Sequence, residues 1–372
     1  MPASTPPTAA ALATLPSQPG SLLLTRTPVP ALGPYDVLVG TIRVGICGTD
    51  REIIRGDLGT PPDGTDELVI GHEVAGRVLA VGPEVTRVSP GQVVTATVRR
   101  PDGCPACLAG EPDMCLWLTY TERGIAGEPG FLCERWVERE DWVIPVPDAL
   151  EPIAVLIEPL TVVEKAVRQA EAIQRRLAYW KPERAIVIGA GPIGLLGTLL
   201  LRAKGLAVTT VARTPKPNPA ANLVEASGAV YRSLREASLD EIAASIGNVD
   251  IILECSGNAE VALDAMRAIG VNGVEVLLSV SGDRGPIPLP ADQMNASMVV
   301  GNKVVVGSVN AGMVDFVNAV ERLGTFERLW PGLAERFITK RMPFGPDLDL
   351  HAIANKSPNE IKTVIEFGTT IS

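Results

Sequence analysis

The segment Arg184–Gly205, RAIVIGAGPIGLLGTLLLRAKG, joins an apolar strand-like run to a helix-like run through a glycine-rich turn. The turn contains Gly189-x-Gly191-x-x-Gly194 directly after the strand and directly before the helix, which is the context that a dinucleotide fingerprint requires. The first glycine permits a tight turn, the second lets the backbone approach a pyrophosphate, and the third lets the helix pack closely on the strand. The partial positive charge of a helix N-terminus favours the phosphates. This stretch predicts a Rossmann unit that binds a dinucleotide, with a ligand-free glycine turn as the alternative.

The sequence beyond this turn alternates apolar strand-like runs with helix-like runs up to about residue 310. The runs include LAVTTVAR, VDIILECSG, GVEVLLSV and NKVVVGSV. Such alternation predicts an α/β fold with a parallel sheet that is covered by helices. The dinucleotide contacts that we expect come from the glycine turn and from the loops after these strands: Gly189, Gly191, Pro192, Ile193, Gly194, Arg213, Thr214, Ser256 and Ser279.

The loop after the next strand indicates which dinucleotide is bound. Arg213 and Thr214 stand where an acidic residue would hold the ribose hydroxyls of NAD. No carboxylate is there to repel a 2′-phosphate, and an arginine can pair with one through charge-assisted hydrogen bonds. We therefore expect NADP to be preferred to NAD, while the use of both cofactors and a merely solvated arginine stay open. The Pro-rich run RTPKPNPAAN, residues 213–222, is predicted to be a loop.

The N-terminal part of the chain has a different texture. From about residue 9 to residue 148 it consists of short β-like runs that glycine and proline interrupt, such as YDVLVGTIRVGI and EVAGRVLAVG. This pattern predicts an antiparallel, partly barrel-shaped β domain. We expect a catalytic domain at residues 1–180, completed by residues 311–372, and a dinucleotide-binding domain at residues 181–310.

Charge and composition exclude some classes of partner. The formal net charge of −10 argues against nucleic acid, which binds to basic surfaces. No apolar run reaches the ~20 residues that span a bilayer, and the N-terminal stretch MPASTPPTAAALATLPSQPG lacks the basic start and apolar run of a signal peptide. Three of the six cysteines fall within Cys104–Cys115, which suits metal binding in a reducing compartment better than a disulfide framework. We expect a cytoplasmic protein with no membrane or nucleic-acid partner.

One of the chain's two histidines lies in LVIGHEVAGRV, residues 68–78. Before His72 comes Cys47 in VGICGTD, and well after it comes Glu158 in LIEPLTVVEKA. Zinc accepts thiolate, imidazole and carboxylate donors, and three protein ligands leave a fourth position for water or substrate, as in catalytic zinc sites. A histidine in a strand is by itself more often a packed core residue, so the prediction depends on the three residues together. The second histidine, His351, lies outside every motif, and we expect it to be structural or on the surface.

The residues around His72 extend this pattern. Gly71-His72-Glu73-x-x-Gly76, followed by Gly82 and Val85, resembles the signature of zinc-containing medium-chain alcohol and polyol dehydrogenases. The stretches CGTDREIIRG, IEPLTVVEKA, GNKVVVGSVN and EIKTVIEF resemble the glucose dehydrogenase branch of that family. With the Rossmann turn, the resemblance covers essentially the whole chain. It implies a GroES-like catalytic domain beside the Rossmann domain, and a homodimer or homotetramer.

The resemblance also implies a reaction and roles for individual residues. Zinc would lower the pKa of a sugar hydroxyl, and hydride would pass from the anomeric carbon to NADP or NAD, giving a lactone. The proton would leave through Thr49 or through a water held by Glu73, and Asp50 would orient the ligands. Thr49 and Asp50 could instead only cap their turn. The implied zinc ligands are Cys47, His72, Glu158 and, as an alternate or water-linked ligand, Glu73.

A second cysteine cluster lies in RRPDGCPACLAGEPDMC, residues 99–115. Cys104, Cys107 and Cys115 resemble the last three positions of the family's four-cysteine structural zinc lobe. The first position holds Pro101, which has no ligating side chain, although the neighbouring Asp102 could supply a carboxylate oxygen. We expect a structural zinc there, with a loop of merely buried thiols as the alternative.

The substrate pocket is the least defined part of the prediction. Sugar recognition needs several polar side chains, because each buried hydroxyl left unpaired costs about 1–3 kcal/mol. The resemblance nominates Glu122 and Asn310, whereas Val98, Val162 and Val300 stand where some sugar-binding relatives carry polar residues. The implied substrate is an aldose, D-glucose first. A dehydrogenase for a simpler alcohol or cyclic polyol and a non-catalytic NADP-binding protein are the alternatives.

Overall fold

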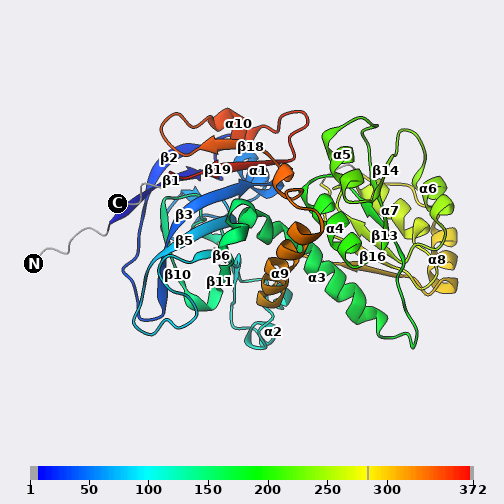
Figure 1. The fold of residues 1–372 in the computed structure, drawn as a ribbon, viewed down its shortest axis with the longest axis horizontal. Helices are drawn as coiled ribbons and strands as arrows, with labels where there is room; N and C mark the ends of the chain where they lie inside the picture. Colours follow the sequence, from blue (N-terminus) through cyan, green and yellow to red (C-terminus); the bar gives the residue numbers. More distant parts are fainter. Residues whose placement is uncertain (1–6, 283–284, 369–372) are drawn as a thin grey trace, which may run out of the picture. The chain divides into compact units, whose positions relative to one another are not determined.

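The computed structural model describes residues 7–282 and 285–368, which form two compact units (Figure 1). The first unit contains the described residues up to Glu158, together with Asn310–Val320 and the described residues from Phe337 onward. The second contains Pro159–Val309 and Glu321–Arg336. The chain therefore passes from one unit to the other inside helix α3 (Ile157–Gln174), and the domain limits expected at residues 180 and 310 stay a prediction.

The first unit is built on a seven-stranded sheet. Its strand order is β11-β6-β5-β3-β19-β18, and β10 also pairs with β3. All pairs are antiparallel except β18 with β19, so the C-terminal part of the chain completes the sheet that the N-terminal part begins. The strands are β3 (Asp36–Ile46), β5 (Glu73–Val81), β6 (Val93–Ala96), β10 (Arg135–Arg139), β11 (Val143–Val146), β18 (Ile338–Pro343) and β19 (Lys362–Glu366).

Two small sheets and short helices cover this sheet's core. In the first part of β3, Val37 and Val39 are fully buried and alternate with more exposed residues, as the period-two pattern of a half-buried strand requires. They share one cluster with Phe131 and Trp136, whose ring centroids are 4.7 Å apart. The other elements are β1 (Thr8–Thr14), β2 (Leu23–Pro28), β4 (Leu68–Val69), β7 (Arg99–Arg100), β8 (Thr121–Arg123), β9 (Gly127–Glu128), α1 (Gly48–Arg55), α2 (Pro105–Leu108) and α10 (Leu350–Ala354), with η1 (Pro112–Met114), η2 (Glu140–Trp142), η3 (Asp148–Leu156) and η4 (Glu335–Phe337).

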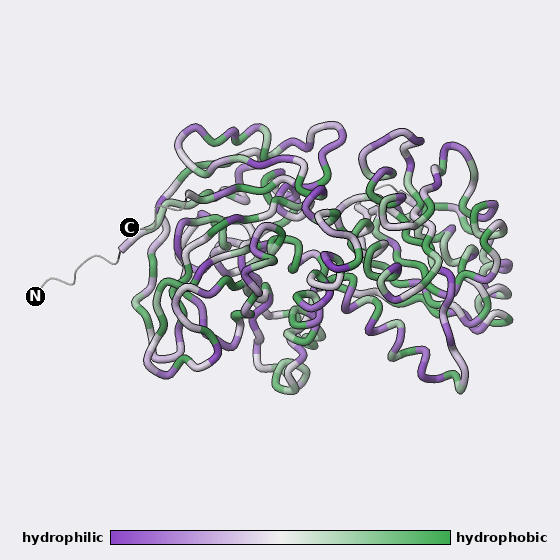
Figure 2. Tube along the Cα trace, in the orientation of Figure 1, coloured by the Kyte–Doolittle hydropathy of each residue, from purple (hydrophilic) through white to green (hydrophobic). Residues whose placement is uncertain are grey.

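The second unit is a six-stranded parallel sheet of order β14-β13-β12-β15-β16-β17. In chain order this is the 3-2-1-4-5-6 arrangement of a Rossmann fold, whose strand order reverses between β12 and β15. Figure 2 shows apolar colours along its central strands, where Ile186 and Ile252 are fully buried. The elements are β12 (Arg184–Ile188), β13 (Ala207–Ala212), β14 (Val230–Ser233), β15 (Ile251–Glu254), β16 (Val274–Leu277), β17 (Val304–Gly307), α4 (Pro192–Ala203), α5 (Pro219–Ala226), α6 (Leu239–Ile246), α7 (Ala259–Ala268) and α8 (Ala291–Val300), and α9 (Met313–Leu329) follows them.

The loop after β13 is shorter than the sequence predicts. The Pro-rich run at residues 213–222 is predicted to be a loop, but α5 begins inside it at Pro219. Asn218 caps this helix, since its Oδ1 accepts a hydrogen bond from Ala221 N at 2.9 Å, and proline fits the first helical position because no N–H is needed there. The loop prediction is therefore wrong for residues 219–222.

Among the described residues, no helix combines the length and the apolar composition needed to cross a membrane.

One core residue of the second unit carries a carboxyl group that has no hydrogen-bond partner among the described residues. Glu275 on β16 is fully buried, and neither of its carboxyl oxygens has a hydrogen-bond partner among the described residues. It pairs in register with Ile252, so it shares a sheet face with Glu254, two residues further along β15. Burial, and to a smaller extent the charge of Glu254, raises the pKa of Glu275 to about 8.

We expect Glu275→Met to remove a pH-dependent loss of stability. The pKa of Glu275 is about 8 in the folded chain, against an ordinary value near ~4.3 in the unfolded chain, so the folded state holds a proton that the unfolded state releases. The native protein should therefore lose stability as the pH rises from about 4 to about 8, by an amount on the order of a few kcal/mol. Urea unfolding at both pH values should find Glu275→Met more stabilising at pH 8, and an equal effect at both would contradict this account.

Candidate functional site

Cys47 and His72 meet because two antiparallel strands end side by side. β3 ends at Ile46, β5 begins at Glu73, and the register pairs Gly45 with Glu73. Cys47 follows the end of one strand and His72 precedes the start of its neighbour, so both lie at the same edge of the sheet. Cys47 Sγ and His72 Nε2 are 3.2 Å apart.

The buried carboxylate of Asp50 holds the backbone beside both residues. Its Oδ2 accepts a hydrogen bond from Cys47 N at 2.8 Å, and its Oδ1 accepts one from Gly71 N at 3.2 Å. Oδ1 also lies 3.6 Å from His72 Nδ1, which has no hydrogen-bond partner in the described part of the chain. Asp50 therefore fixes both the turn that carries Cys47 and the residue that precedes His72.

Glu158, in the first turn of α3, joins this cluster. Ligand atoms of His72, Glu73 and Glu158 lie within 4.8 Å of one another, and so do those of Cys47, Asp50 and His72. Burial raises the pKa of Glu158 to about 7, and burial followed by the charge of Asp50 raises the pKa of Cys47. Buried groups of this kind become anionic when a cation binds them, and sulfur, imidazole nitrogen and carboxylate oxygen are donors that zinc accepts. The residues expected from the sequence therefore fit a zinc ion.

Lys362 is a member of the cluster that the sequence analysis missed. Its ammonium group forms an ion pair with Glu73 Oε2, and both side chains are almost fully buried. A Cβ on Gly45 would overlap the same carboxylate, so glycine at that position makes room for Glu73. Lys362 lies in EIKTVIEF, a stretch that marks the branch but says nothing by itself about its partner. The Lys362 ion pair engages Oε2 of Glu73, and a carboxylate oxygen of Glu73 also lies within 4.8 Å of ligand atoms of His72 and Glu158.

Thr49 lies in the first turn of α1, two residues after Cys47. Its side chain is half-buried, and its hydroxyl hydrogen-bonds to none of the described residues. The hydroxyl is therefore available to a substrate or to a water molecule.

The dinucleotide turn has the geometry that its three glycines suggest. Gly189 has a φ of 103°, and a Cβ there would lie 2.7 Å from the carbonyl oxygen of Cys255. A Cβ on Gly194 would overlap the carbonyl oxygen of Gly189, whereas one on Gly191 would meet no atom within 4 Å. The space beside Gly191 is thus open to a ligand, at the N-terminus of α4, where Pro192 takes the first helical position.

Arg213 directly follows β13 and is exposed. It forms no ion pair with any of the described residues, so its guanidinium group is free to bind an anion. The backbone around it is held by two side chains, since Ser233 Oγ donates to Arg213 O at 2.9 Å and the Tyr231 hydroxyl donates to Thr214 O at 2.7 Å. This arrangement presents a fixed loop with an unpaired cation.

The two serines expected to contact the cofactor are both bound to one buried carboxylate. Glu254, at the end of β15, accepts hydrogen bonds from Ser256 N at 2.7 Å and Ser256 Oγ at 2.5 Å, and from Ser279 Oγ. Ser279 Oγ in turn accepts a bond from Gly257 N at 2.8 Å. Glu254 was missed in the sequence, although an acidic residue ending the apolar run DIILE is an available signal. It orders the loops that follow β15 and β16.

The second cysteine cluster brings four possible metal donors together, three thiols and one carboxylate. Ligand atoms of Asp102, Cys104, Cys107 and Cys115 all lie within 4.8 Å of one another, and Asp102 Oδ2 is 2.9 Å from Cys115 Sγ. Burial would raise the pKa of Cys104, but backbone N–H donors from Leu116 and Cys107 lower it to about 7. Three sulfurs and one carboxylate oxygen are sufficient for a closed tetrahedral zinc site. The structure thus places the Asp102 carboxylate beside the three sulfurs, whereas Pro101 has no donor atom to offer.

The two residues nominated for sugar binding contact each other. Asn310 Nδ2 donates to Glu122 Oε1 at 2.7 Å, and Asn310 Oδ1 accepts from Ala311 N at 2.7 Å. The same Glu122 oxygen receives Arg99 Nε at 3.1 Å and Nη2 at 3.0 Å, while the Arg99 guanidinium stacks 3.6 Å from the centre of the Tyr120 ring. Arg99, which the sequence analysis missed, leaves Glu122 Oε2 as an acceptor for a hydroxyl group.

Two family models match the chain. Residues 33–148 match the alcohol dehydrogenase GroES-like domain, and residues 151–367 match the glucose dehydrogenase C-terminus. The glucose 1-dehydrogenase of Methanocella arvoryzae is 41% identical over 334 residues, which are 89% of this chain and 93% of that protein. The glucose 1-dehydrogenase of Thermoproteus tenax is 38% identical over 360 residues, which are 96% and 99% of the two chains.

A solved structure supports the same grouping. Glucose dehydrogenase from Haloferax mediterranei, in complex with NADP, Zn and gluconolactone, has a TM-score of 0.88 with this chain and is 32% identical to it. The match covers 97% of this chain and 99% of that one.

We expect Asp102 to be needed for a second zinc ion. After dialysis against a weak chelator, mass spectrometry should find about two zinc ions per chain in the natural protein and about one in Asp102→Ala, because three thiolates leave the tetrahedron open. Asp102→Cys, which supplies a fourth sulfur, should again hold two. The alanine variant should also unfold at a lower temperature, since bound metal stabilises the folded state. Two zinc ions in Asp102→Ala would remove Asp102 from the ligand set.

Proposed function

Because the chain belongs to the zinc-dependent medium-chain alcohol dehydrogenases, in the glucose dehydrogenase branch of that family, we propose that it oxidises an aldose, D-glucose first, at the anomeric carbon. The product is the lactone, and the hydride passes to NADP. The observation that carries this proposal is the pair of donor groups that share His72, one with Cys47 and one with Glu158, in a chain that also has a Rossmann dinucleotide turn. Alignment along nearly the whole chain with glucose 1-dehydrogenases supports the same activity.

The residues around Cys47 and His72 have different roles in metal binding and in proton removal. Cys47, His72 and Glu158 would hold a zinc ion, which would supply Lewis-acid polarisation of the reacting hydroxyl. Thr49 Oγ1, with no hydrogen bond to the described residues, takes the hydroxyl proton and passes it on. Glu73, which forms an ion pair with Lys362, can hold a water molecule that receives this proton. Asp50 keeps the backbone of the ligands in place.

In this proposal a carboxylate oxygen of Glu122 binds a hydroxyl group of the sugar. Glu122 Oε1 is saturated by Arg99 and Asn310, so Oε2 accepts a hydroxyl of the substrate. A fixed, charged acceptor discriminates strongly against a molecule that lacks the matching hydroxyl. Val98 is buried and offers no such contact, which favours tolerance at another sugar position.

The zinc-loaded protein should reduce NADP with D-glucose and not with simple alcohols of the same concentration. Cys47→Ser should lower kcat by about 100-fold or more, because the bound hydroxyl is no longer polarised, while NADP binding measured by fluorescence stays unchanged. Activity with alcohols or cyclic polyols alone would replace the aldose in this proposal. Bound zinc with no turnover on any substrate would instead favour a non-catalytic NADP-binding protein.

Preference for NADP rests on Arg213 in this proposal. Arg213→Ala should lower kcat/KM for NADP by at least about tenfold, the effect of losing a charge-assisted contact with the 2′-phosphate, and should change kcat/KM for NAD little. Arg175→Ala, at another exposed arginine of the same unit, is the matched control. An equal loss with both cofactors would exclude a specific role for Arg213.

We also propose a homo-oligomer, dimer or tetramer, in the cytoplasm. β17 is the last strand of its sheet in the described part of the chain, and its valines are only half-buried. The nearby helix α8 buries none of its residues, and Val299 and Val300 are 67% and 81% exposed. A second copy that covers this edge would protect it from pairing with other strands. Light scattering should give a multiple of 39.2 kDa.

The proposed location in the cytoplasm is supported by the cysteines. All six are free thiols, as expected in a reducing compartment.

A further inference from the structure

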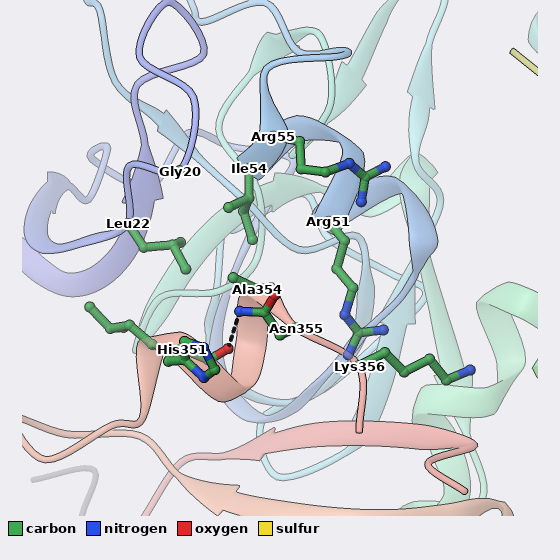
Figure 3. Close-up of a pocket in the computed structure, with 10 residues that line it drawn as sticks. Gly20, Leu22, Arg51, Ile54, Arg55, His351, Ala354, Asn355 and Lys356 are labelled. Atoms are coloured by element: carbon green, nitrogen blue, oxygen red, sulfur yellow. Dashed lines mark hydrogen bonds between the residues drawn. The ribbon is translucent and has the colours of Figure 1, made fainter. Parts of the chain in front are cut away.

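The first unit contains an open pocket that none of the sites above uses. It has a volume of about 570 Å³ and lies between the turn after β1, helix α1, and α10 with the residues that follow it (Figure 3). None of the residues proposed as metal, cofactor or sugar ligands lines it. Its volume is within the range of pockets that bind small molecules, about 300–1,000 Å³.

The polar part of the pocket is basic. Arg51, Arg55, His351 and Lys356 line it, and no acidic residue does. In a chain with a formal net charge of −10, such a concentration of positive groups is unusual. Positive side chains that gather at a concave surface attract anions, to the extent that neighbouring acidic groups do not neutralise them.

The cations differ in how far they are neutralised. Arg51 is fixed, because its Nη2 donates to Glu360 Oε1 at 2.6 Å and its Nε donates to Ile353 O at 3.1 Å. Arg55 pairs with Asp57 at 2.9 Å, but both side chains are more than half exposed, so water screens the pair.

Lys356 forms no ion pair with any described residue. Lys356 is exposed at the surface, but partial burial of its ammonium group, followed by the positive charge of Arg51, lowers its pKa, while the charge of Glu360 opposes this shift. A bound anion would raise the pKa again. In Figure 3 its side chain starts beside the end of Arg51. The pocket therefore has a held arginine, a weakly paired arginine and an unpaired lysine.

The rest of the pocket is apolar. Leu22 and Ile54 extend toward the space above α10 in Figure 3, and Leu350 and Ala354 come from α10 itself. Asn355 Nδ2 donates one of its two N–H groups to His351 O at 3.0 Å, which holds this side chain against α10. A fitting ligand needs an anionic end for the basic groups and a compact apolar part for the remaining surface.

We propose that this pocket binds a small molecule with an oxyanion head, a phosphate monoester or a carboxylate, and a short apolar body. The head lies among Arg51, Arg55 and Lys356, and the body lies against Leu22 and Ile54. Such a ligand bridges α1 and α10. It therefore stabilises the helix that also carries Asp50, the residue that holds the backbone of Cys47.

Calorimetric titration with inorganic phosphate tests the head group. The zinc-loaded protein is saturated with NADP so that the dinucleotide turn is occupied, and ionic strength is held constant with sodium chloride. We expect saturable binding, and a Kd at least tenfold higher in Arg55→Gln/Lys356→Gln. The control Arg175→Gln/Lys181→Gln, which neutralises two exposed basic residues elsewhere, should bind as the natural protein does.

Circular dichroism and zinc content should be the same in the three proteins, and Lys356→Gln alone should show at least a threefold rise in Kd. This single variant keeps the test valid if the double variant folds poorly. Absent or unsaturable binding by the natural protein, or equal binding by all variants, would overturn the proposal. A general stabilisation by phosphate, which excluded salts produce without a site, would appear equally in every variant.

Titration with butyl phosphate and with hexanoate then shows whether the pocket prefers a phosphate monoester or a carboxylate. The preferred anion should bind at least fivefold more tightly than inorganic phosphate, because its apolar part adds contact with Leu22 and Ile54. Leu22→Ser should remove this advantage and leave phosphate binding unchanged. Equal affinity for 1-hexanol, which has no charge, would show that the basic groups do not recognise the ligand and would overturn the proposal.

Discussion

The geometry of the first unit depends on one buried carboxylate, that of Asp50. It accepts hydrogen bonds from two backbone N–H groups. The antiparallel register of β3 and β5 already brings Cys47 and His72 to the same edge of the sheet. Register alone does not fix a turn, however, and Cys47 lies just beyond the last residue of β3. By binding Cys47 N and Gly71 N at once, Asp50 converts two adjacent chain segments into one rigid frame. The backbone that carries Cys47 and precedes His72 is thereby fixed, and groups that orient metal ligands in this way raise metal affinity.

Buried charges surround this frame, and each is matched by a charge from a distant segment. Glu73 is paired with Lys362, Arg51 with Glu360, and Glu122 with Arg99. A buried pair gains little net stability, because removing both ions from water is costly, but removing one partner leaves an uncompensated charge. These pairs therefore fix one arrangement of the segments and exclude others. Glu275 in the parallel sheet of the second unit differs from these pairs, because neither of its carboxyl oxygens has a hydrogen-bond partner among the described residues.

The sequence was sufficient for features that depend on local pattern. The glycine turn at Gly189–Gly194, with its strand and helix, predicted the Rossmann unit, and the strand order of the sheet agrees with it. Resemblance to a known family grouped Cys47, His72 and Glu158, and the structure brings their ligand atoms into overlapping clusters. Lys362, Arg99 and Glu254 were missed because their meaning lies in long-range pairing, which no spacing along the chain reveals. The start of α5 was missed for a different reason: the prolines around Asn218 concealed a helix cap.

The late position of β19 in the chain has a consequence for how the protein is made. This strand pairs with β3 and brings Lys362 to Glu73, although β3 and β5 are translated long before it. A nascent chain on the ribosome can form the β3–β5 pair, but its Glu73 faces an incomplete interior until the last strand has left the exit tunnel. A ribosome that stalls before Lys362 therefore leaves β3 without its neighbour β19 and Glu73 without its ion-pair partner.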